Sequence, residues 1–169
     1  MFQEIKPTEL NENVFDLIGK QWLLVTAGKP DGTCNTMTAS WGGLGVMWGK
    51  NVAFLVIRPQ RYTKEFIDSS ETLSISVLPD GYKKQYGYLG SVSGRDEDKI
   101  AKTGLTVVKD GETPYFEEAR LSMICRKLFA QPYDPEAFLD KKTEEDCYPQ
   151  KDYHTLYICE IEKVLVKEQ

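Results

Sequence analysis

Short runs of apolar residues recur along the chain, separated by segments rich in turn-forming residues. Five such runs have the length and the aliphatic or aromatic composition of strands: residues 22–27, 52–57, 73–78, 121–129 and 155–166. Residues 73–78 alternate apolar and polar positions, which predicts a half-buried strand. The turn-rich segment 28–32 predicts a hairpin that joins residues 22–27 to a further strand over residues 35–40.

Helical periodicity is confined to short segments. The first carries an apolar stripe formed by Leu10, Val14, Leu17 and Ile18. This helix is expected to end at Gly19. Residues 61–70 place two apolar side chains on one side and charges on the other. The run Ser93-Gly94-Arg95-Asp96 has the form of a capping box and predicts a helix that begins there.

The order of these elements indicates the fold class. Strands and helices do not alternate regularly, as a doubly wound sheet requires. Many short strands with a few isolated helices instead predict a mainly β protein, an antiparallel closed or partly closed barrel with peripheral helices. The polar stretch 134–153 is expected to run over the surface. Neither repeats nor linkers divide the chain, so residues 1–169 are expected to form a single domain.

Composition narrows the function classes. Hydrophobic residues make up 41% of the 169 residues, enough for one core, and the net charge is −5. Basic residues are scattered, which disfavours a nucleic-acid partner. The first residues lack the apolar run of a signal peptide, and no stretch approaches the roughly 18 apolar residues of a membrane span. We therefore expect a soluble, cytoplasmic protein without a membrane partner.

The cysteines predict no metal site. Cys34, Cys125, Cys147 and Cys159 are spread singly, and the chain has one histidine, whereas structural zinc sites usually use paired ligands at short spacing. Reduced, structural thiols are expected. Cys34 stands apart because it adjoins the segment of greatest chemical interest, although no resolving partner lies near it in sequence.

That segment is Asn35-Thr36-Met37-Thr38-Ala39-Ser40-Trp41. In an extended chain, Thr38 and Ser40 share one face and the backbone amides point sideways, available to carbonyl and imide groups of a ring. Trp41 would supply a stacking surface. The alternative is an ordinary strand end whose tryptophan lies in the core.

A second segment, Arg58-Pro59-Gln60-Arg61-Tyr62-Thr63, follows one strand later. Arg58 and Arg61 suit forked hydrogen bonds to phosphate oxygens, and Thr63 falls in the first turn of a predicted helix, where an anion is favoured. The alternative places Arg58 in solvent and pairs Arg61 with Glu65. Together the two segments indicate the binding site of a phosphorylated, planar aromatic cofactor such as flavin mononucleotide (FMN).

Two further residues are candidates for this site. His154 is the only imidazole of the chain, and a pKa near neutrality would suit proton delivery to a reduced ring or a substrate. Lys99 would reach a flavin edge or a phosphate. The alternatives are a surface histidine and a solvated lysine.

Four motifs in order carry a family resemblance. They are Asn-Thr-Met-Thr-Ala-Ser-Trp at 35–41, Arg-Pro-Gln-Arg-Tyr-Thr at 58–63, Ser-Gly-Arg-Asp at 93–96 with Asp98-Lys99, and His-Thr-Leu-Tyr-Ile-Cys-Glu-Ile at 154–161. Over nearly its whole length the chain resembles the flavoredoxin-like branch of the flavin reductase family. This resemblance implies an FMN-binding split barrel, usually a homodimer with the flavin near the subunit interface.

The resemblance also implies roles for individual residues. Those implied to contact the ring and its edge are Met37, Thr38, Ala39, Ser40 and Trp41. Arg58, Tyr62 and Thr63 would serve the phosphate end, Ser93 and Lys99 would lie nearby, and His154 would face the redox site. Cys159 departs from the glycine of typical relatives, which bears on an NAD(P)H site more than on the FMN site.

The leading hypothesis is an FMN-dependent oxidoreductase that takes hydride from NAD(P)H. One alternative is an electron carrier reduced by a redox protein partner. Another is a split barrel that binds a different phosphorylated ligand, or none, without redox chemistry. Relatives include both reductases and carriers, and the motifs do not separate these functions.

Overall fold

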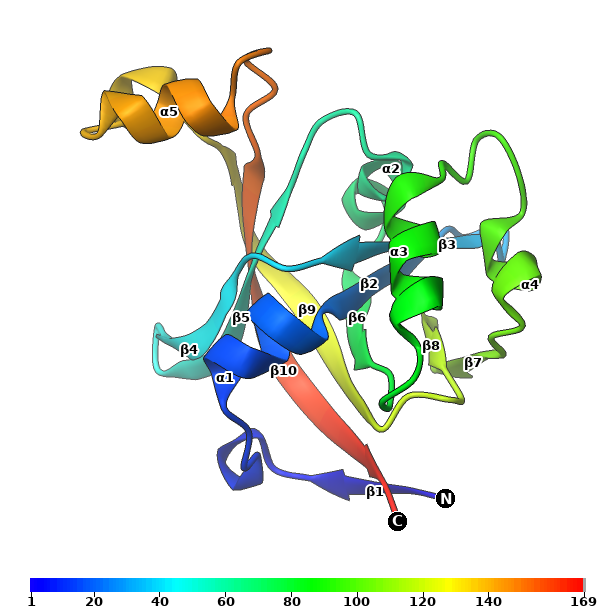
Figure 1. Ribbon diagram of the computed structural model, residues 1–169. Coiled ribbons are helices and arrows are strands. Elements are labelled where there is room, and N and C mark those ends of the chain that lie inside the picture. Colours follow the sequence, from blue (N-terminus) through cyan, green and yellow to red (C-terminus); the bar gives the residue numbers. More distant parts are fainter. Residues whose placement is uncertain (169) are drawn as a thin grey trace.

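Eight strands form one antiparallel sheet in the computed structural model, which describes residues 1–168 (Figure 1). Along the sheet they follow the order β3 (Cys34–Ala39), β2 (Leu23–Gly28), β6 (Thr72–Val77), β9 (Leu121–Pro132), β10 (Thr155–Lys167), β5 (Lys50–Ile57) and β4 (Gly43–Met47). The eighth strand, β1 (Phe2–Ile5), pairs with the C-terminal part of β10. A separate hairpin is formed by β7 (Val107–Asp110) and β8 (Thr113–Phe116).

The connection from β3 to β4 makes this sheet a split barrel. These strands lie at opposite ends of the sheet order, yet only Ser40, Trp41 and Gly42 separate them in sequence. Four residue steps span at most about 14 Å. The sheet therefore curls until its two ends approach, and no ladder of hydrogen bonds joins β3 to β4 in the described residues. The predicted antiparallel split barrel is confirmed.

The longest strands, β9 and β10, pair along most of their length and hold the barrel together. The first half of β10 also pairs with β5, and its last residues pair with β1. Register irregularities interrupt the pairing of β9 with β10 at Ile158/Cys159 and at Ile161/Lys163. Such bulges increase local bend and twist, which suits strands that must curve.

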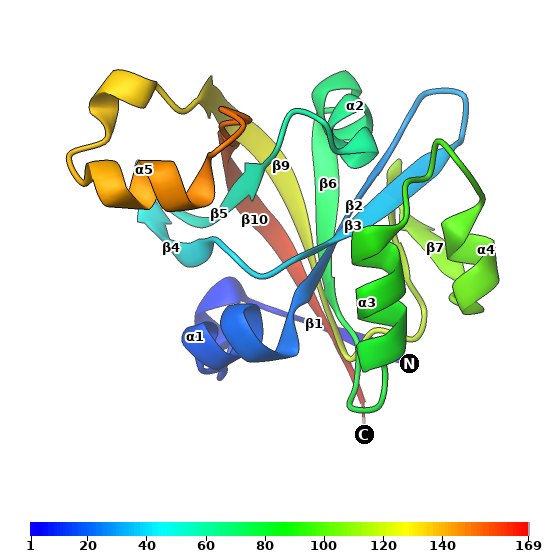
Figure 2. The same cartoon turned by 45° about the horizontal axis from the view of Figure 1, so that its top comes forward.

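Helices surround the barrel. They are α1 (Val14–Asp16), which continues as a π-helical turn over Leu17–Gln21, α2 (Tyr62–Ser69), α3 (Lys83–Ser91), α4 (Lys99–Thr103) and α5 (Lys141–Cys147). Short 3₁₀ turns occur at Pro7–Glu9 and Pro135–Ala137. Figure 2 shows α3 beside β2 and β3, while α5 projects beyond the end of β9 that lies far from the chain termini. No helix among residues 1–168 is long and apolar enough to cross a membrane.

The core has two parts. The barrel interior holds the larger cluster, to which Leu17, Ile57, Leu73, Met123 and Tyr157 belong. A second cluster lies on the other face of β2 and includes Leu24, Leu89, Ile100, Leu105 and Phe116. Because both faces of β2 are covered, its residues from Leu23 to Ala27 are all buried.

The prediction that residues 73–78 form a strand is confirmed, but its half-buried character is wrong. Ser74 and Ser76 are fully buried because the hairpin of β7 and β8 and the neighbouring strand cover them. The Ser74 hydroxyl donates to the carbonyl of Pro114 at 2.6 Å, and the Ser76 and Ser122 hydroxyls pair at 2.9 Å. The two serines are the polar positions of the alternating pattern, but their hydroxyls find hydrogen-bond partners inside the protein and need no solvent.

Two predicted helix boundaries are also wrong. The first helical segment begins at Val14, with the Asn13 side chain as its cap, and continues past Gly19 to Gln21. No helix begins at Ser93. Its hydroxyl accepts the N–H of Arg95 in a turn, and α4 starts only at Lys99, capped by Asp98. A serine close to an acidic residue fits a turn as readily as a capping box, and tertiary packing selects the turn.

Candidate functional site

The two polar segments meet in one cleft of about 340 Å³ at the gap of the barrel. Its walls are formed by Met37, Thr38, Ala39, Ser40, Trp41, Val56, Arg58, Gln60, Arg61 and His154. The volume lies within the roughly 300–1,000 Å³ of small-molecule sites. The sequence-predicted proximity of residues 37–41 and 58–61 is therefore confirmed, and His154 faces the same space.

Trp41 lies on the rim of this cleft rather than in the core, since 49% of its surface is exposed. Its ring centroid is 5.3 Å from that of His154. The next residue, Gly42, has φ of +133°, and a Cβ atom there would lie 2.4 Å from the carbonyl oxygen of Phe54. Only glycine allows this approach, so Gly42 fixes the turn that presents Trp41.

A smaller pocket of about 120 Å³ continues from the cleft. It is lined by Asn35, Met37, Gln60, Arg61, Tyr62, Thr63, Ser91, Val92, Ser93 and Lys99. Met37, Gln60 and Arg61 line both spaces, so the pocket adjoins the cleft. The predicted site residues thus divide into two groups. Tyr62, Thr63, Ser93 and Lys99 lie at the pocket, and the others line the cleft.

Lys99 is the most unusual residue of the pocket. Only 4% of its surface is exposed, and its ammonium donates to the carbonyls of Leu89 at 2.7 Å and Val92 at 2.9 Å. Burial, together with the charge of Arg61, lowers the pKa of Lys99 to about 8. No carboxylate within residues 1–168 pairs with it. The alternative of a solvated lysine is wrong.

Arg61 brings a second positive charge to the same pocket. Its guanidinium donates to the carbonyl of Gly90 at 2.8 Å, and burial and the charge of Arg58 lower its pKa. The alternative pairing of Arg61 with Glu65 is wrong, because Glu65 instead contacts Arg95 and Lys29. Arg61 and Lys99 therefore leave two positive charges uncompensated by side chains of the described residues, and buried charges are normally paired.

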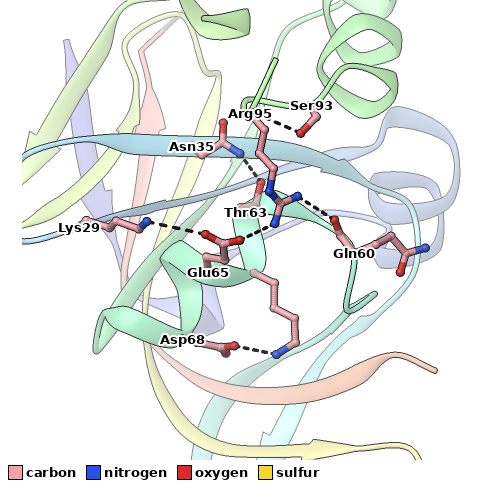
Figure 3. Close-up of polar contacts among 9 residues, drawn as sticks. Lys29, Asn35, Gln60, Thr63, Glu65, Asp68, Ser93 and Arg95 are labelled. Atoms are coloured by element: carbon pink, nitrogen blue, oxygen red, sulfur yellow. Dashed lines mark hydrogen bonds and ion pairs between the residues drawn. The ribbon is translucent and has the colours of Figure 1, made fainter. Parts of the chain in front are cut away.

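Polar contacts around the start of α2 fix the shape of this pocket (Figure 3). The Asn35 side chain donates to the buried hydroxyl of Thr63 at 2.9 Å. Arg95, from the turn after α3, lies over the ring of Tyr62, donates to the carbonyl of Gln60 at 3.2 Å and pairs with Glu65. These contacts hold the loop around Ser93 against the N-terminal end of α2.

Arg58 lies in the cleft but does not line the pocket. It pairs with Asp152 at 2.9 Å and donates to the carbonyl of Cys147, also at 2.9 Å. Its guanidinium carbon lies 4.9 Å from the ring centroid of Tyr148. Arg58 therefore anchors the segment after α5, and Arg61 rather than Arg58 reaches the pocket shared with Tyr62 and Thr63.

His154 is buried, with 7% of its surface exposed, and its Nδ1 lies 2.6 Å from the hydroxyl of Tyr148. The alternative of a surface histidine is wrong. The expected near-neutral pKa is wrong as well, because burial and the charge of Arg58 lower the pKa of His154 to about 4. At neutral pH the imidazole therefore carries no charge.

Cys159 and Cys34, the two thiols singled out from the sequence, line neither the cleft nor the small pocket. Cys159 belongs to the main core, and burial raises its pKa to about 12. Cys34 is half-buried in a neighbouring cavity, where burial also raises its pKa. A low-pKa, exposed thiolate is what redox reactivity requires. Within residues 1–168, no group of three or more His, Cys, Asp or Glu side chains is arranged to hold a metal.

Several lining residues were not singled out from the sequence. Asn35 and Gln60 belong to the two motifs, so their position was a usable signal. Ser91 and Val92 follow no such signal, because their place depends on how the loop after α3 folds back. The same holds for Tyr148, which does not line the cleft but contacts His154.

The fold is a split barrel, and a cleft with an adjoining pocket that holds two positive side chains opens at its gap. Its family follows from sequence comparison: the model of the flavin reductase like domain matches residues 15–169, and the chain belongs to that family. No curated protein matches the chain.

Solved structures agree with this assignment at the level of the fold. Flavoredoxin of Desulfovibrio vulgaris (Miyazaki F) has a TM-score of 0.69 and 23% identity, covering 97% of this chain and 78% of that chain. An FMN-binding domain of a flavin reductases-like enzyme from Shewanella baltica OS155 gives 0.69 and 16%, covering 98% and 77%. Nitrilotriacetate monooxygenase component B from Bacillus cereus gives 0.68 and 18%, covering 97% and 81%.

Proposed function

We propose that the protein binds FMN, with the phosphate in the small pocket and the ring in the cleft. The observation that carries this proposal is the uncompensated pair formed by the part-buried Arg61 and the buried Lys99. A phosphate dianion would neutralise both charges through charge-assisted hydrogen bonds. The N-terminal end of α2, which has no side-chain cap, adds a favourable dipole at the same place.

The cleft suits the rest of the cofactor. Met37 and Val56 supply apolar contacts, while the extended backbone from Thr38 to Ser40 offers polar groups to the edge of a ring. The Thr38 hydroxyl already donates to the carbonyl of Tyr86 at 2.6 Å, so it fixes α3 rather than the ligand. Trp41 would cover a ring face at the rim.

We further propose that the protein is an NAD(P)H-dependent reductase. When bound, FMN supplies the redox chemistry, and the protein supplies binding, orientation and electrostatics. Bound FMN would couple the oxidation of a reduced nicotinamide to the two-electron reduction of an acceptor, and the residues of the cleft and the pocket would hold and orient the flavin. Membership of the flavin reductase like family and a half-exposed Trp41 beside an open cleft support a second ligand there.

The phosphate assignment is tested by Arg61→Gln. Binding of FMN should weaken by roughly 1.5–3 kcal/mol, the value of a hydrogen bond to a charged group. Riboflavin lacks the phosphate and should lose far less, which separates loss of the anion site from general loosening. Lys64→Gln is the matched control, because Lys64 pairs with Asp68 on the same helix. Titration of flavin fluorescence gives all these affinities.

Equal weakening of FMN and riboflavin by Arg61→Gln would contradict the phosphate assignment. Failure of the wild-type protein to bind FMN at all would contradict the proposed function and favour a split barrel for another ligand.

The reductase activity is tested by anaerobic mixing of the FMN-loaded protein with NADH or NADPH. Loss of the visible absorbance of the oxidised flavin is expected with at least one of them. A flavin that is reduced by dithionite and by neither nicotinamide would contradict the reductase and favour an electron carrier that depends on a protein partner.

We also propose that the protein acts as a homodimer in the cytoplasm. An exposed apolar surface formed by Val46, Met47, Trp48 and Phe129 lies around the end of β4 and supports association of two copies. In a reducing compartment the four free cysteines of the described chain would remain thiols.

A further inference from the structure

The segment after α5 brings a buried tyrosine onto the single histidine of the cleft. Tyr148 ends α5, and its N–H donates to the carbonyl of Glu144 at 2.8 Å. Lys151 donates its N–H to the carbonyl of Tyr148 at 3.0 Å and adopts φ of +56°, so the chain reverses direction. This turn allows residues 148 and 154 to face each other.

The Tyr148 side chain is held firmly. Its ring packs against Phe138 and Tyr153, with centroids 5.6 and 5.0 Å away, and the guanidinium of Arg58 covers it. The ring of His154 stands nearly perpendicular to that of Tyr148 at 5.5 Å. Both residues are buried, so the 2.6 Å contact between the Tyr148 hydroxyl and His154 Nδ1 lies away from bulk water.

Hydrogen-bond accounting selects one tautomer of the imidazole. Within residues 1–168, the only acceptor for the Tyr148 hydroxyl is His154 Nδ1. If Nδ1 carried the proton, it would donate to the hydroxyl oxygen and leave the O–H hydrogen without an acceptor. A buried donor left unsatisfied is costly. Tyr148 therefore donates, Nδ1 accepts, and the imidazole proton lies on Nε2.

The Nε2 atom is open to the cleft. It has no hydrogen-bond partner among the described residues. Gln85 Oε1 is the only fully buried side-chain nitrogen or oxygen in that range without a partner, so Nε2 itself is not fully buried. Since His154 lines the cleft beside Trp41, its Nε2 reaches accessible space there.

The charges around His154 favour the neutral ring. Arg58 opposes protonation, whereas Asp152 favours it and is itself paired with Arg58. Tyr148 keeps its proton, because burial raises its pKa, and Tyr133, whose ring lies 6.3 Å away, is likewise protonated with a raised pKa. Burial adds to the effect of Arg58, so an uncharged imidazole is the stable form at neutral pH.

We propose that Tyr148 is a positioning residue that holds His154 as the neutral Nε2–H tautomer. A ligand in the cleft then meets an uncharged hydrogen-bond donor suited to a carbonyl oxygen or another acceptor, and it meets no imidazolium acid. The tautomer is a property of the free protein, and only its use by a flavin or a nicotinamide rests on the proposed function.

Nitrogen-15 NMR of the 169-residue protein tests this directly, because His154 is its only histidine and gives one set of side-chain signals. At pH 7 the two-bond nitrogen–proton correlations should show the Nε2–H pattern. In Tyr148→Phe, which keeps the packed ring, the pattern should shift toward a mixture of both tautomers, because Nδ1 loses its hydrogen-bond donor. Backbone amide spectra verify that the variant is folded.

Tyr153→Phe is the matched control, because this tyrosine packs in the same cluster but donates to Glu144 at 2.6 Å. Its histidine signals should match those of the wild type. An Nδ1–H or imidazolium pattern in the wild type at pH 7, or a Tyr148→Phe spectrum identical to the wild type, would overturn the proposal. These outcomes need no flavin, so they stand apart from the test of FMN binding.

Discussion

At the scale of single residues, the site depends on groups whose burial changes their ionisation. Lys99 is charged at neutral pH although it is buried, since its pKa remains near 8. The cost of that burial is offset in part by two carbonyl acceptors, Leu89 and Val92. A bound dianion would complete the compensation, and ligand binding should therefore depend on the protonation of Lys99.

The first prediction is a loss of FMN affinity as the pH rises through about 8. A bound phosphate would raise the pKa of Lys99, so the complex keeps a proton that the free protein loses. Between pH 7.5 and 9 the dissociation constant should rise by up to about tenfold, the limit for loss of one linked proton. Titrations across this range measure it.

Two comparisons isolate the cause of this pH dependence. Riboflavin, without the phosphate, should bind with little change over the same interval. Lys99→Met should bind FMN more weakly at pH 7.5 and should show a flat profile. A profile in the variant as steep as that of the wild type would assign the linked proton to another group.

The second prediction concerns stability in acid. The folded-state pKa of His154 is about 4, below the ordinary value of about 6.5, so the unfolded chain takes up a proton first as the pH falls. The neutral, buried ring therefore makes its full contribution to the free energy of unfolding above pH 6.5, and this contribution is lost as the pH falls from 6.5 to 4. The free energy of unfolding should decrease by on the order of 1–2 kcal/mol more in the wild type than in His154→Gln over that interval. Urea unfolding at both ends of the interval measures the difference.

Local pattern explains which residues of the site were predictable. Met37 to Trp41 and Arg58 to Thr63 are contiguous segments, so their residue types alone indicated a polar site beside a strand. The state of His154 was not predictable. Its hydrogen bond comes from Tyr148 and its lowered pKa from burial and Arg58, and these groups come together only when the segment after α5 folds back. Similarly, the burial of Lys99 depends on the loop that follows α3.

At the scale of elements, the helix α3 connects the core to the site. Two side chains that line the cleft donate to carbonyls of α3. Thr38 of β3 donates to Tyr86, and Arg61 donates to Gly90. A Cβ atom at Gly90 would lie 3.1 Å from Cβ of Thr38, whereas nothing lies within 4 Å of a Cβ atom at Gly87. The helix therefore approaches the strand closely at one glycine only.

The third prediction compares the two glycines. Gly87→Ala should stabilise the protein by about 0.5–1 kcal/mol, the gain in helix propensity. Gly90→Ala makes the same chemical change but requires Thr38 or α3 to move by a few tenths of an ångström, so it should be less stable than Gly87→Ala by about 1 kcal/mol. Thermal or urea unfolding of both variants measures this. A Gly90→Ala protein as stable as Gly87→Ala would show that α3 can shift without cost.

Strand positions were more predictable than helix boundaries for a physical reason. The runs at 52–57, 121–129 and 155–166 are largely apolar, and the structure extends them by two, three and one residues, respectively. The start of α4 was misplaced because Ser93 and Asp98 both suit a helix start, and only packing of the intervening turn against α2 decides between them.

At the scale of the whole molecule, the gap between β3 and β4 has two consequences. The cleft lies there, and the outer edges of these two strands are left without a partner strand among the described residues. β4 is the last strand of the sheet order, and its outer edge has no partner strand within residues 1–168. Unpaired edges with apolar side chains favour association with another chain. The neighbouring Trp48 is 58% exposed, and its ring lies 6.2 Å from that of Phe129.

The fourth prediction is that Trp48 contributes to the proposed homodimer. Sedimentation of the wild type should give twice the 19.3 kDa mass of one chain, and Trp48→Asn should shift the protein toward the monomer. Asparagine suits the left-handed backbone at this position, where φ is +53°, so the fold should be kept. Leu139→Asn is the control. Leu139 is 99% exposed in the loop that precedes α5, outside the surface formed by Val46, Met47, Trp48 and Phe129. A dimer that withstands Trp48→Asn, or one that Leu139→Asn dissociates equally, would place the interface elsewhere on the molecule.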